Sequence, residues 1–504
     1  MTIIFPESGT GTAAAPAFML RPLVSTFQAD TETPVSVYLK MQRPYSCLLE
    51  SVEGEELLAR FSYIAVDPVA VLQGTVGGDV SIEIRDERFR ALESTLREGR
   101  DLRGIVDRCL EAFASAEMPR SKSGSPSMTT SGVFGYFGYD AMHLIEKIPA
   151  AELPDPAGLP DLCLLFCDTL VIFDNVMRKL FVVANYLDDS DRERAERKIE
   201  ELAALIFEPL DRDLVPLRPE IPEPVVSNTT REEYYDKVLK AKEYILSGDI
   251  FQVQVSQRLR RKLHTRPFDV YRVLRTINPS PYLYFFDFDD FQVVGSSPEL
   301  LVKVERDHSG RRIVDTRPIA GTRRRGESFE DDERIARELL ADEKECAEHL
   351  MLIDLSRNDI GRIAKIGTVE TNEMMVIEMY SHVMHIVSNV RGELQDGLSA
   401  MDAFWSCFPA GTLTGAPKVR SMEIIYDLEK EKRGLYGGSV GYLDFRGNLT
   451  TAIAIRTMVI RDGIIYFQAA GGIVADSTPE NEFEETMNKM RAGLTALESI
   501  ETAS

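Results

Sequence analysis

The sequence predicts an α+β fold in which large antiparallel sheets are covered by helices. Three observations lead to this prediction: the expected strands come in groups, helices stand between the groups, and no short repeat of fixed length occurs. A regular alternation of strand and helix would instead have indicated a parallel sheet. With 504 residues, 44% of them hydrophobic, the chain is long enough to form one large domain or two to three smaller ones.

The first half of the chain is expected to be mostly strand, with one charged helix near its end. Short runs of β-branched, aromatic and other apolar residues indicate the strands. These runs lie at Val35–Leu39, Tyr45–Ser51, Phe61–Asp67, Ser131–Tyr136, Leu162–Phe173 and Lys179–Val183. The charged helix is expected at Asp191–Ile206, and the Ser/Pro-rich stretch Pro119–Ser131 is expected to be a surface loop.

Residues 209–227 are expected to connect two regions of the sequence, 1–208 and 228–504. This stretch holds five prolines among alternating acidic and basic residues, a composition typical of a connector. Directly after it, Thr230 is followed three residues later by Glu233. This spacing is the signal of a capping box, so we expect a helix to begin there.

The second half is expected to alternate groups of strands with longer helices. Helices are expected from Arg231 to near Gly248, over Phe329–Ser356, after Lys418, and after the N-cap Thr478. Strands are expected at Phe251–Leu259, Tyr282–Phe286, Gln292–Ser296, Leu300–Val304 and Arg312–Thr316, in a hairpin over Gly437–Arg461 that turns at Arg446–Asn448, and from Ile464.

Composition excludes several classes of function. The net charge of −23 argues against electrostatic binding to nucleic acid or to an anionic membrane. No apolar run is long enough to span a bilayer, and the first residues do not resemble a secretion signal. The six cysteines show no close spacing of the zinc or redox kind. We therefore expect a cytoplasmic protein with reduced thiols.

Two helices are candidates for holding a metal ion. Glu482, Glu485 and Lys489 share one helix face just after the Gly471-Gly472 turn, and this set could hold a divalent cation together with an anionic substrate. Taken alone, the pattern also fits an ordinary solvated acidic face. Glu348 lies at the border between polar and apolar halves of another helix, where a carboxylate needs either a metal ion or a salt bridge.

Further motifs supply groups that bind anions. GTLTGAPK at 411–418 lacks the Gly-Lys-Ser/Thr ending of a nucleotide loop, but its backbone donors could hold a carboxylate. PIAGTR at 318–323 joins a tight turn to arginines that are expected to form a surface patch. Tyr436 and Arg456 add a hydroxyl and a guanidinium suited to a carboxylate, although a structural ion pair is the commoner role of such an arginine.

Taken in order, these motifs resemble the chorismate-utilising enzymes, and among them most closely the large subunits of anthranilate synthases. PIAGTR, the run EHLMLIDLSRND at 348–359, GTLTGAPK and AGGIVADS at 470–477 carry the resemblance in the second half. LLES at 48–51 and GYFGYD at 135–140 carry it in the first half. The resemblance implies a four-layer α/β/β/α sandwich with two large, nearly orthogonal antiparallel sheets.

The resemblance implies a Mg²⁺ ion that bridges the enzyme and the ring carboxylate of chorismate. Its ligands are expected to be Glu348 and Glu485, with Glu482 as a further or water-mediated ligand. The other carboxylate of the substrate is expected to contact Tyr436 and Arg456. The remaining substrate-binding residues are expected to be Gly321, Thr322, Ala470, Gly471, Gly472 and Lys489.

The resemblance also assigns the chemistry. Glu299, in SPEL at 297–300, is expected to be the general acid for the leaving hydroxyl. His385 is expected to take part in the aromatising elimination; His382, three residues earlier, is the other histidine of this segment. Thr412 is placed with the catalytic residues. Gln252 stands where water-adding relatives carry a lysine base, and Ala320 stands where relatives that make the 4-amino product carry a lysine nucleophile. Both residues favour direct attack by ammonia.

The resemblance implies two further partners. No cysteine lies in a Gly-x-Cys-x-Gly context, so ammonia is expected from a separate glutamine amidotransferase subunit or from solution. A tryptophan site for feedback inhibition is expected at Glu50, Ser51, Pro281, Tyr282 and Leu283. The alternatives are an aminodeoxychorismate synthase, an enzyme of a secondary pathway, for example one that stops at the aminated intermediate, and a non-catalytic amino-acid-binding regulator.

Overall fold

The computed structural model describes residues 16–51, 60–99, 101–116, 128–149, 153–210, 223–380 and 383–502. Most of the loop expected at Pro119–Ser131 and most of the connector at 209–227 lie outside these ranges. His382 also lies outside them.

Two large sheets form the centre of the molecule. In spatial order, the first contains β11 (Val226–Ser227), β12 (Gln252–Lys262), β24 (Ile464–Ile473), β23 (Thr457–Arg461), β14 (Phe291–Ser297), β13 (Tyr282–Asp287), β2 (Ser46–Glu50), β3 (Phe61–Ala65), β9 (Thr169–Asp174), β10 (Lys179–Tyr186), β1 (Phe18–Gln28) and β6 (Phe113–Ser115), with β20 (Gly415–Ala416) paired to β12. The second contains β17 (Ile319–Arg324), β19 (Val383–Glu393), β16 (Arg312–Thr316), β15 (Leu300–Arg306), β22 (Leu449–Ile453), β21 (Ser439–Asp444), β7 (Gly132–Phe137), β8 (Leu162–Cys167), β4 (Ala70–Gly74) and β5 (Val80–Ile84), with β18 (Glu370–Met379) paired to β19.

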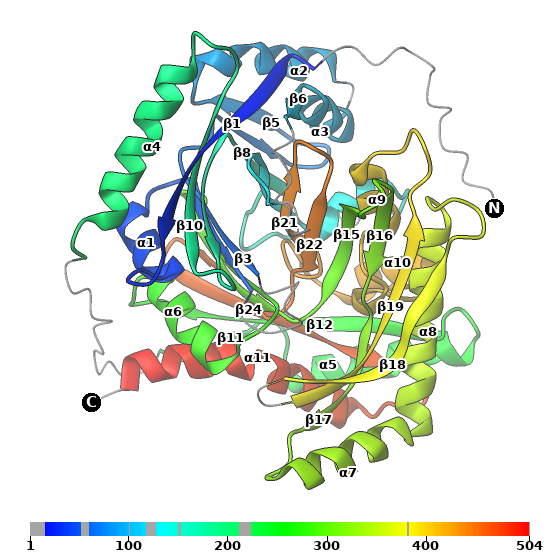
Figure 1. Ribbon diagram of the computed structural model, residues 1–504. Helices are drawn as coiled ribbons and strands as arrows, with labels where there is room; N and C mark the ends of the chain where they lie inside the picture. Colours follow the sequence, from blue (N-terminus) through cyan, green and yellow to red (C-terminus); the bar gives the residue numbers. More distant parts are fainter. Residues whose placement is uncertain are drawn as a thin grey trace.

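Both sheets combine strands from the two regions of the sequence. In the first sheet β2 pairs with β13, and in the second β7 pairs with β21. Residues 1–208 and 228–504 are therefore joined by backbone hydrogen bonds within each sheet. Every ladder among the described strands is antiparallel except that between β1 and β6. In Figure 1, β12 and β24 run across the view while β15, β16 and β22 run up it, so strands of the two sheets cross.

Helices cover the outer faces of the two sheets. They are α1 (Pro34–Met41), α2 (Glu93–Glu98), α3 (Leu102–Glu111), α4 (Arg192–Phe207), α5 (Arg231–Leu246), α6 (Pro267–Ile277), α7 (Phe329–Leu340), α8 (Glu343–Gly361), α9 (Ala400–Cys407), α10 (Lys418–Leu428) and α11 (Pro479–Thr502). Apolar residues of α1, α4, α6 and α11 pack on the first sheet, those of α5 and α10 pack on β12 of the same sheet, and those of α3, α8 and α9 pack on the second. A third cluster fills the space between the sheets. The predicted α+β class with two large helix-covered sheets is confirmed.

Two expected elements differ in the structure because of helix caps. The expected strand at Val35–Leu39 is wrong, since α1 covers it: Thr33 and Ser36 form a capping box, and Pro34 starts the helix. The single long helix expected at Phe329–Ser356 is also wrong. Asp342 accepts hydrogen bonds from two backbone amides and begins α8 as a separate helix after α7.

The chain passes between the sheets at points where the sequence predicted continuous strands. The expected strand Leu162–Phe173 divides at Asp168, because β8 belongs to the second sheet and β9 to the first. The expected hairpin at Gly437–Arg461 likewise holds only β21 and β22, and β23 belongs to the first sheet. The link from β22 to β23 contains Arg456, whose φ of 49° is outside the strand region.

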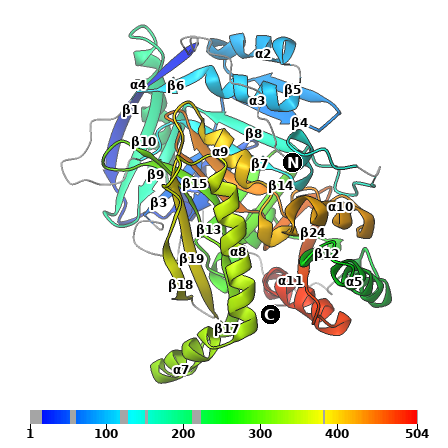
Figure 2. The ribbon, with the colours of Figure 1, turned by 90° about the vertical axis from the view of Figure 1, so that its right-hand side faces the viewer.

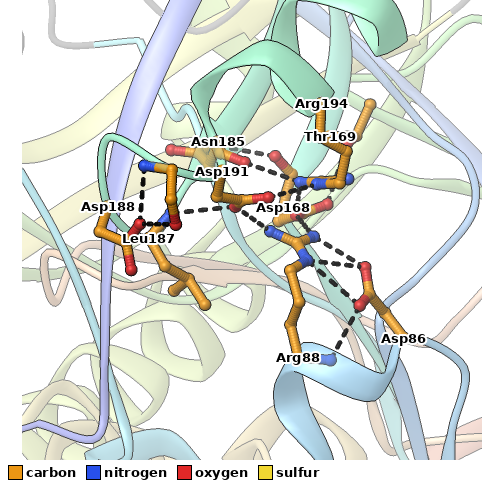
Figure 3. Close-up of polar contacts among 10 residues, drawn as sticks. Asp86, Arg88, Asp168, Thr169, Asn185, Leu187, Asp188, Asp191 and Arg194 are labelled. Carbon is orange, nitrogen blue, oxygen red and sulfur yellow. Dashed lines mark hydrogen bonds and ion pairs between the residues drawn. The ribbon is translucent and has the colours of Figure 1, made fainter.

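A network of ion pairs around the buried carboxylate of Asp168 fixes the crossing at that residue (Figure 3). Arg88 binds Asp86, Asp168 and Asp191, with N–O distances of 2.6 to 2.7 Å. Arg194 adds a second cation on Asp168 and Asp191. We call these five residues the Arg88 network. It ties the start of α4 to the turn between β8 and β9.

Candidate active site

The candidate active site lies where the ends of β12 and β24 meet α8 and α11. Figure 2 shows α8 running beside the end of β24, with α11 on the other side of that strand. Two neighbouring links between the sheets also reach this place: one joins β14 to β15 and carries Glu299, and the other carries Arg456. The site is therefore built at the junction of both sheets and two helices.

Glu348 of α8 contacts Gln252 of β12. The side-chain amide of Gln252 donates a hydrogen bond of 2.8 Å to Glu348 Oε1. Burial raises the pKa of Glu348; the amide of Gln252 opposes this shift, and the negative charges of Glu345 and Glu485 add to it. The structure thus brings together two residues that the sequence placed in different roles, and Gln252 orients the carboxylate of Glu348.

The acidic face of α11 lies beside Gly471 and Gly472, as the sequence predicted. The predicted turn at these two glycines is wrong, because both belong to β24 and pair with β12. Glu482 is 7% exposed, and its Oε2 atom finds no hydrogen-bond partner among the described residues. Burial raises the pKa of Glu482 to about 7, although the Ser477 hydroxyl opposes the shift. Glu485 is half-exposed and binds Lys489 at 2.7 Å, and Lys489 also donates to the carbonyl of Ala470 at 2.9 Å.

Glycine is required at 471 because Glu482 approaches the backbone there. A Cβ atom at this position would lie 2.7 Å from Glu482 Oε2 and 3.1 Å from the Tyr234 hydroxyl. At Gly472 a Cβ atom would lie 2.9 Å from the side-chain nitrogen of Gln252. These two glycines allow the acidic helix and β12 to close on the end of β24.

The acidic residues fit a magnesium ion. Within the described ranges, no three acidic, histidine or cysteine side chains form a complete metal cage. Mg²⁺ does not need one, because it binds through one or two carboxylates and completes its shell with water and substrate oxygens. One Glu482 oxygen has no partner among the described residues, and burial raises the pKa values of Glu348 and Glu482, so a cation bound between them would stabilise both ionised carboxylates.

Glu299 lies in the link between β14 and β15 and is 6% exposed. Burial raises its pKa to about 8, while the Thr412 hydroxyl, the Ile319 backbone amide and the charges of Arg456 and Lys489 oppose the shift. At neutral pH its carboxyl group is therefore mostly protonated, as a general acid requires. Thr412 lies in the short helical turn Gly411–Leu413. Its hydroxyl oxygen is buried and has no hydrogen-bond partner among the residues described here.

Arg456 supplies a cation to this site and interacts through its charge with Glu299 and Tyr380. Its guanidinium forms no hydrogen bond or ion pair of ordinary length with a described residue, although it acts on Glu299 and His385 through its charge. Tyr436 is 7% exposed, and its hydroxyl faces the backbone amide of Ala470. The predicted strand position of Arg456 is wrong, but its prediction as a carboxylate-binding group stays open and is compatible with this geometry.

His385 of β19 is held in one tautomer. Its Nδ1 atom lies 3.0 Å from the carbonyl oxygen of Gly321, which can only accept, so Nδ1 carries the hydrogen. The Thr322 hydroxyl lies 3.1 Å from the same nitrogen. Burial and the charge of Arg456 lower the pKa of His385 to about 4, so the ring is neutral with a free Nε2 atom. Gly321 has φ of 60°, a conformation that favours glycine.

The segments expected to form a tryptophan site lie on adjacent strands. Leu283 of β13 is the register partner of Glu50 of β2. The Glu50 carboxylate accepts hydrogen bonds from Tyr271 and Arg275 of α6. Ser51 has a buried hydroxyl with no partner in the described part of the chain. Pro281 is buried and Tyr282 is partly exposed.

Sequence reasoning missed a buried ion pair directly below the site, formed by Glu429 and Arg433. In the sequence, two opposite charges four residues apart at the end of a helix look like an ordinary surface pair. The one sign that this pair lies near the site is that Arg433 stands three residues before Tyr436. The expected surface role of the PIAGTR arginines fits the structure: Arg323 pairs with Asp342 and Glu345, and Arg325 pairs with Asp332.

Comparison with known proteins identifies the class. A family model described as chorismate binding enzyme matches residues 81–495. The chain belongs to this family of chorismate-binding enzymes. Within it, the chain groups with the component 1 proteins of anthranilate synthase. It is 46% identical to anthranilate synthase component 1 of Pseudomonas putida, covering 97% of this chain and 98% of that one, and 46% identical to the Pseudomonas aeruginosa protein, covering 95% and 96%.

A solved structure supports the same grouping. Anthranilate synthase component I from Streptococcus pneumoniae TIGR4 superposes with a TM-score of 0.73 at 34% identity. The match covers 93% of this chain and 98% of that chain. Among the described helices none is both long and apolar enough to cross a membrane.

Proposed function

We propose that the chain is the Mg²⁺-dependent catalytic subunit of anthranilate synthase, which converts chorismate and ammonia to anthranilate, pyruvate and water in the first step of tryptophan biosynthesis. The observation that carries the proposal is the arrangement of unmatched charges: Glu348 and Glu482 on one side, and the unpaired Arg456 beside the protonated Glu299 on the other. Such a site suits a dicarboxylate that brings a metal ion with it.

Binding uses the two groups of charges separately. Glu348 and Glu485, with Glu482 in support, would hold the Mg²⁺ ion, which supplies positive charge against the ring carboxylate of chorismate. Arg456 and the Tyr436 hydroxyl would bind the enolpyruvyl carboxylate. Lys489 and the backbone amides of Gly321 to Thr322 and of Ala470 to Gly472 would complete the contacts with the substrate.

In the first step ammonia forms a C–N bond at ring C2 while the bond from C4 to its hydroxyl breaks. Glu299 gives its proton to the departing oxygen, which leaves as water, and the new ammonium group loses a proton. Gln252 is neutral and holds Glu348, so it cannot act as a base toward water. Ala320 has no nucleophile to offer, which leaves direct addition of ammonia as the route.

In the second step the hydrogen at C2 is removed and the bond between the ring and the enolpyruvyl oxygen breaks. The enolate of pyruvate takes up a proton, and the ring becomes aromatic. Neutral His385, whose ring is oriented by the hydrogen bond from Nδ1 to the Gly321 carbonyl, is the residue suited to this elimination.

Ammonia and tryptophan are the further partners in the proposal. A separate glutamine amidotransferase subunit supplies ammonia in the cell, as the name component 1 of the relatives suggests. Tryptophan binds near Glu50 of β2 and Leu283 of β13 and inhibits the enzyme. The neighbouring strands that carry Glu50 and Leu283, with the unpartnered Ser51 hydroxyl, support such a site.

The test mixes the purified chain with chorismate, Mg²⁺ and an ammonium salt at alkaline pH and identifies the products. Anthranilate with an equal amount of pyruvate, both lost in the presence of a chelator, is the expected result. An aminated product that still carries its enolpyruvyl group would move the assignment to a pathway that stops at this intermediate. Absence of any ammonia-dependent product from chorismate would overturn the proposal.

A further inference from the structure

The buried ion pair between Glu429 and Arg433 has no part in the chemistry above, yet it lies directly behind the site. Arg433 donates from Nε at 3.0 Å and from Nη2 at 2.7 Å to the two carboxylate oxygens of Glu429. The two residues are only 6% and 4% exposed. Because the desolvation of two charges offsets much of their attraction, such a pair is weak evidence of stability and needs another explanation.

The remaining donors of Arg433 reach two segments of the active site. Nη1 donates at 2.7 Å to the carbonyl of Leu413, the residue after Thr412. Nη2 donates at 2.7 Å to the carbonyl of Gln254, two residues after Gln252 on β12. The backbone amide of Gln254 in turn donates to the carbonyl of Thr414 at 2.9 Å. One guanidinium thus joins the 411–414 turn to the strand that carries Gln252.

The same pair has contacts on two other sides. Glu429 Oε1 accepts from the backbone amide of Ser256 at 2.7 Å, which fixes the carboxylate on β12. The guanidinium lies 4.6 Å from the ring centre of Tyr139, in the GYFGYD motif, and 5.8 Å from that of Tyr436. Four of the five N–H donors of Arg433 are used and its planar faces are covered, so its orientation is fixed.

We propose that Arg433 is a positioning residue that holds the 411–414 turn against β12 and thereby keeps Thr412 beside Glu299 in the cavity that both residues line. Arg433 does not touch the substrate in this arrangement. The inference rests on the proposed function, since it assigns a use to the contact between Thr412 and Glu299. A lysine cannot replace Arg433, because a single ammonium group cannot serve the Glu429 carboxylate and both carbonyls in one plane.

The test is a double-mutant cycle between Arg433→Lys and Thr412→Ala, read as the kcat of anthranilate formation with saturating ammonia and Mg²⁺. We expect Arg433→Lys to lower kcat at least tenfold and to change the KM for chorismate less than threefold. The double variant should be no slower than the slower single variant, because both changes remove the same contact. Effects that multiply would overturn the inference, and so would a raised KM with unchanged kcat, which would indicate action through Tyr436.

A matched control separates positioning from general loss of stability. Arg88 is a largely shielded arginine that also binds several carboxylates, and it belongs to a network outside the site. Arg88→Lys should lower the melting temperature and leave kcat within twofold of the unmodified chain. An equal fall of kcat in Arg88→Lys and Arg433→Lys would contradict the inference.

A replacement variant and the activity of the unmodified chain complete the test. If Arg433→Lys does not fold, Glu429→Gln takes its place in the cycle, because the glutamine side chain keeps the size of glutamate and one acceptor oxygen. Its effect on kcat should again be non-additive with that of Thr412→Ala. Effects on kcat that multiply would overturn the inference. Failure of the proposed function is distinguishable, because the unmodified chain itself would then make no anthranilate.

Discussion

Two groups of buried and partly buried carboxylates in this molecule have opposite surroundings. In the Arg88 network, the three aspartates are met by two arginines, and every carboxylate has a cation within 3.2 Å (Figure 3). In the candidate active site, Glu348 has only a neutral amide partner, and one oxygen of Glu482 has no partner among the described residues. The first group has its charges matched and the second does not.

The pKa values reflect this difference. Although burial opposes ionisation, hydrogen bonds from Arg88 lower the pKa of Asp86. Burial raises the pKa of Glu348, that of Glu482 to about 7 and that of Glu299 to about 8, because no neighbouring cation compensates fully. Buried acids matched by cations tie elements together, whereas unmatched buried acids mark a place prepared for a cation, a substrate or a proton transfer.

The largest effect is expected from removing an acidic residue of the proposed metal site. Glu348→Ala and Glu485→Ala should each lower kcat/KM on the order of a thousandfold, because the metal ion would lose a ligand. Steady-state assays of anthranilate fluorescence, with melting curves for each variant, measure this. Glu484→Ala is the control, since that exposed residue pairs with Arg231 at 2.8 Å and should keep activity within twofold. If Glu348→Ala kept kcat/KM within tenfold of the unmodified chain, Glu348 would not be a metal ligand.

The next effect concerns the proton on Glu299. Its pKa is raised to about 8 from an ordinary value of 4.5, so the acidic form is present below pH 8 and is lost as pH rises through that value. With free ammonia held constant, kcat should therefore fall above pH 8. Glu299→Gln should lower kcat by about a hundredfold or more.

Thr412 sharpens this prediction, because its hydroxyl lowers the pKa of Glu299. Thr412→Val should move the fall of kcat to higher pH than in the unmodified chain. A fall at the same pH in both proteins, measured across the same buffers and ammonia concentration, would show that the two side chains do not interact.

Breaking the matched group should affect stability alone. Arg88→Met leaves Asp86, Asp168 and Asp191 with less positive charge. Because only Asp168 of these three is buried, we expect a loss of unfolding free energy below the roughly 3–5 kcal/mol of a fully buried pair. Urea unfolding measures that loss, and kcat at a temperature well below the transition should stay within twofold. A large drop in kcat without a loss of stability would make the Arg88 network part of the active site instead.

The smallest effect is expected at Glu50, a carboxylate that has a cationic partner but lies in an expected ligand site. Glu50 is matched by Arg275 and Tyr271, yet it lies in the expected tryptophan site. Glu50→Gln should weaken inhibition by tryptophan about tenfold, which is the loss of one charged hydrogen bond, and leave kcat unchanged. Inhibition curves at fixed chorismate test it, and unchanged inhibition would remove Glu50 from that site.

The sequence by itself determined the fold class and the residues of the candidate site. Grouped strands indicated helix-covered antiparallel sheets, and the capping box of Thr230 and Glu233 correctly marked the start of α5. Motif order brought Glu348, Glu485 and Glu299 to attention, and the helical spacing of Glu482, Glu485 and Lys489 fixed their common face. Such signals are short-range, because caps, turns and helix faces depend on residues a few positions apart.

Only the tertiary structure decided where the chain leaves one sheet for the other. The crossing at Asp168, the link that carries Arg456, and the contact of Arg433 with Leu413 and Gln254 join residues far apart in sequence. Whether a buried charge is matched depends on those distant partners, which no local pattern specifies. Composition and spacing could therefore name the charged residues, while three-dimensional pairing decided which of them stabilise the fold and which are left for a ligand.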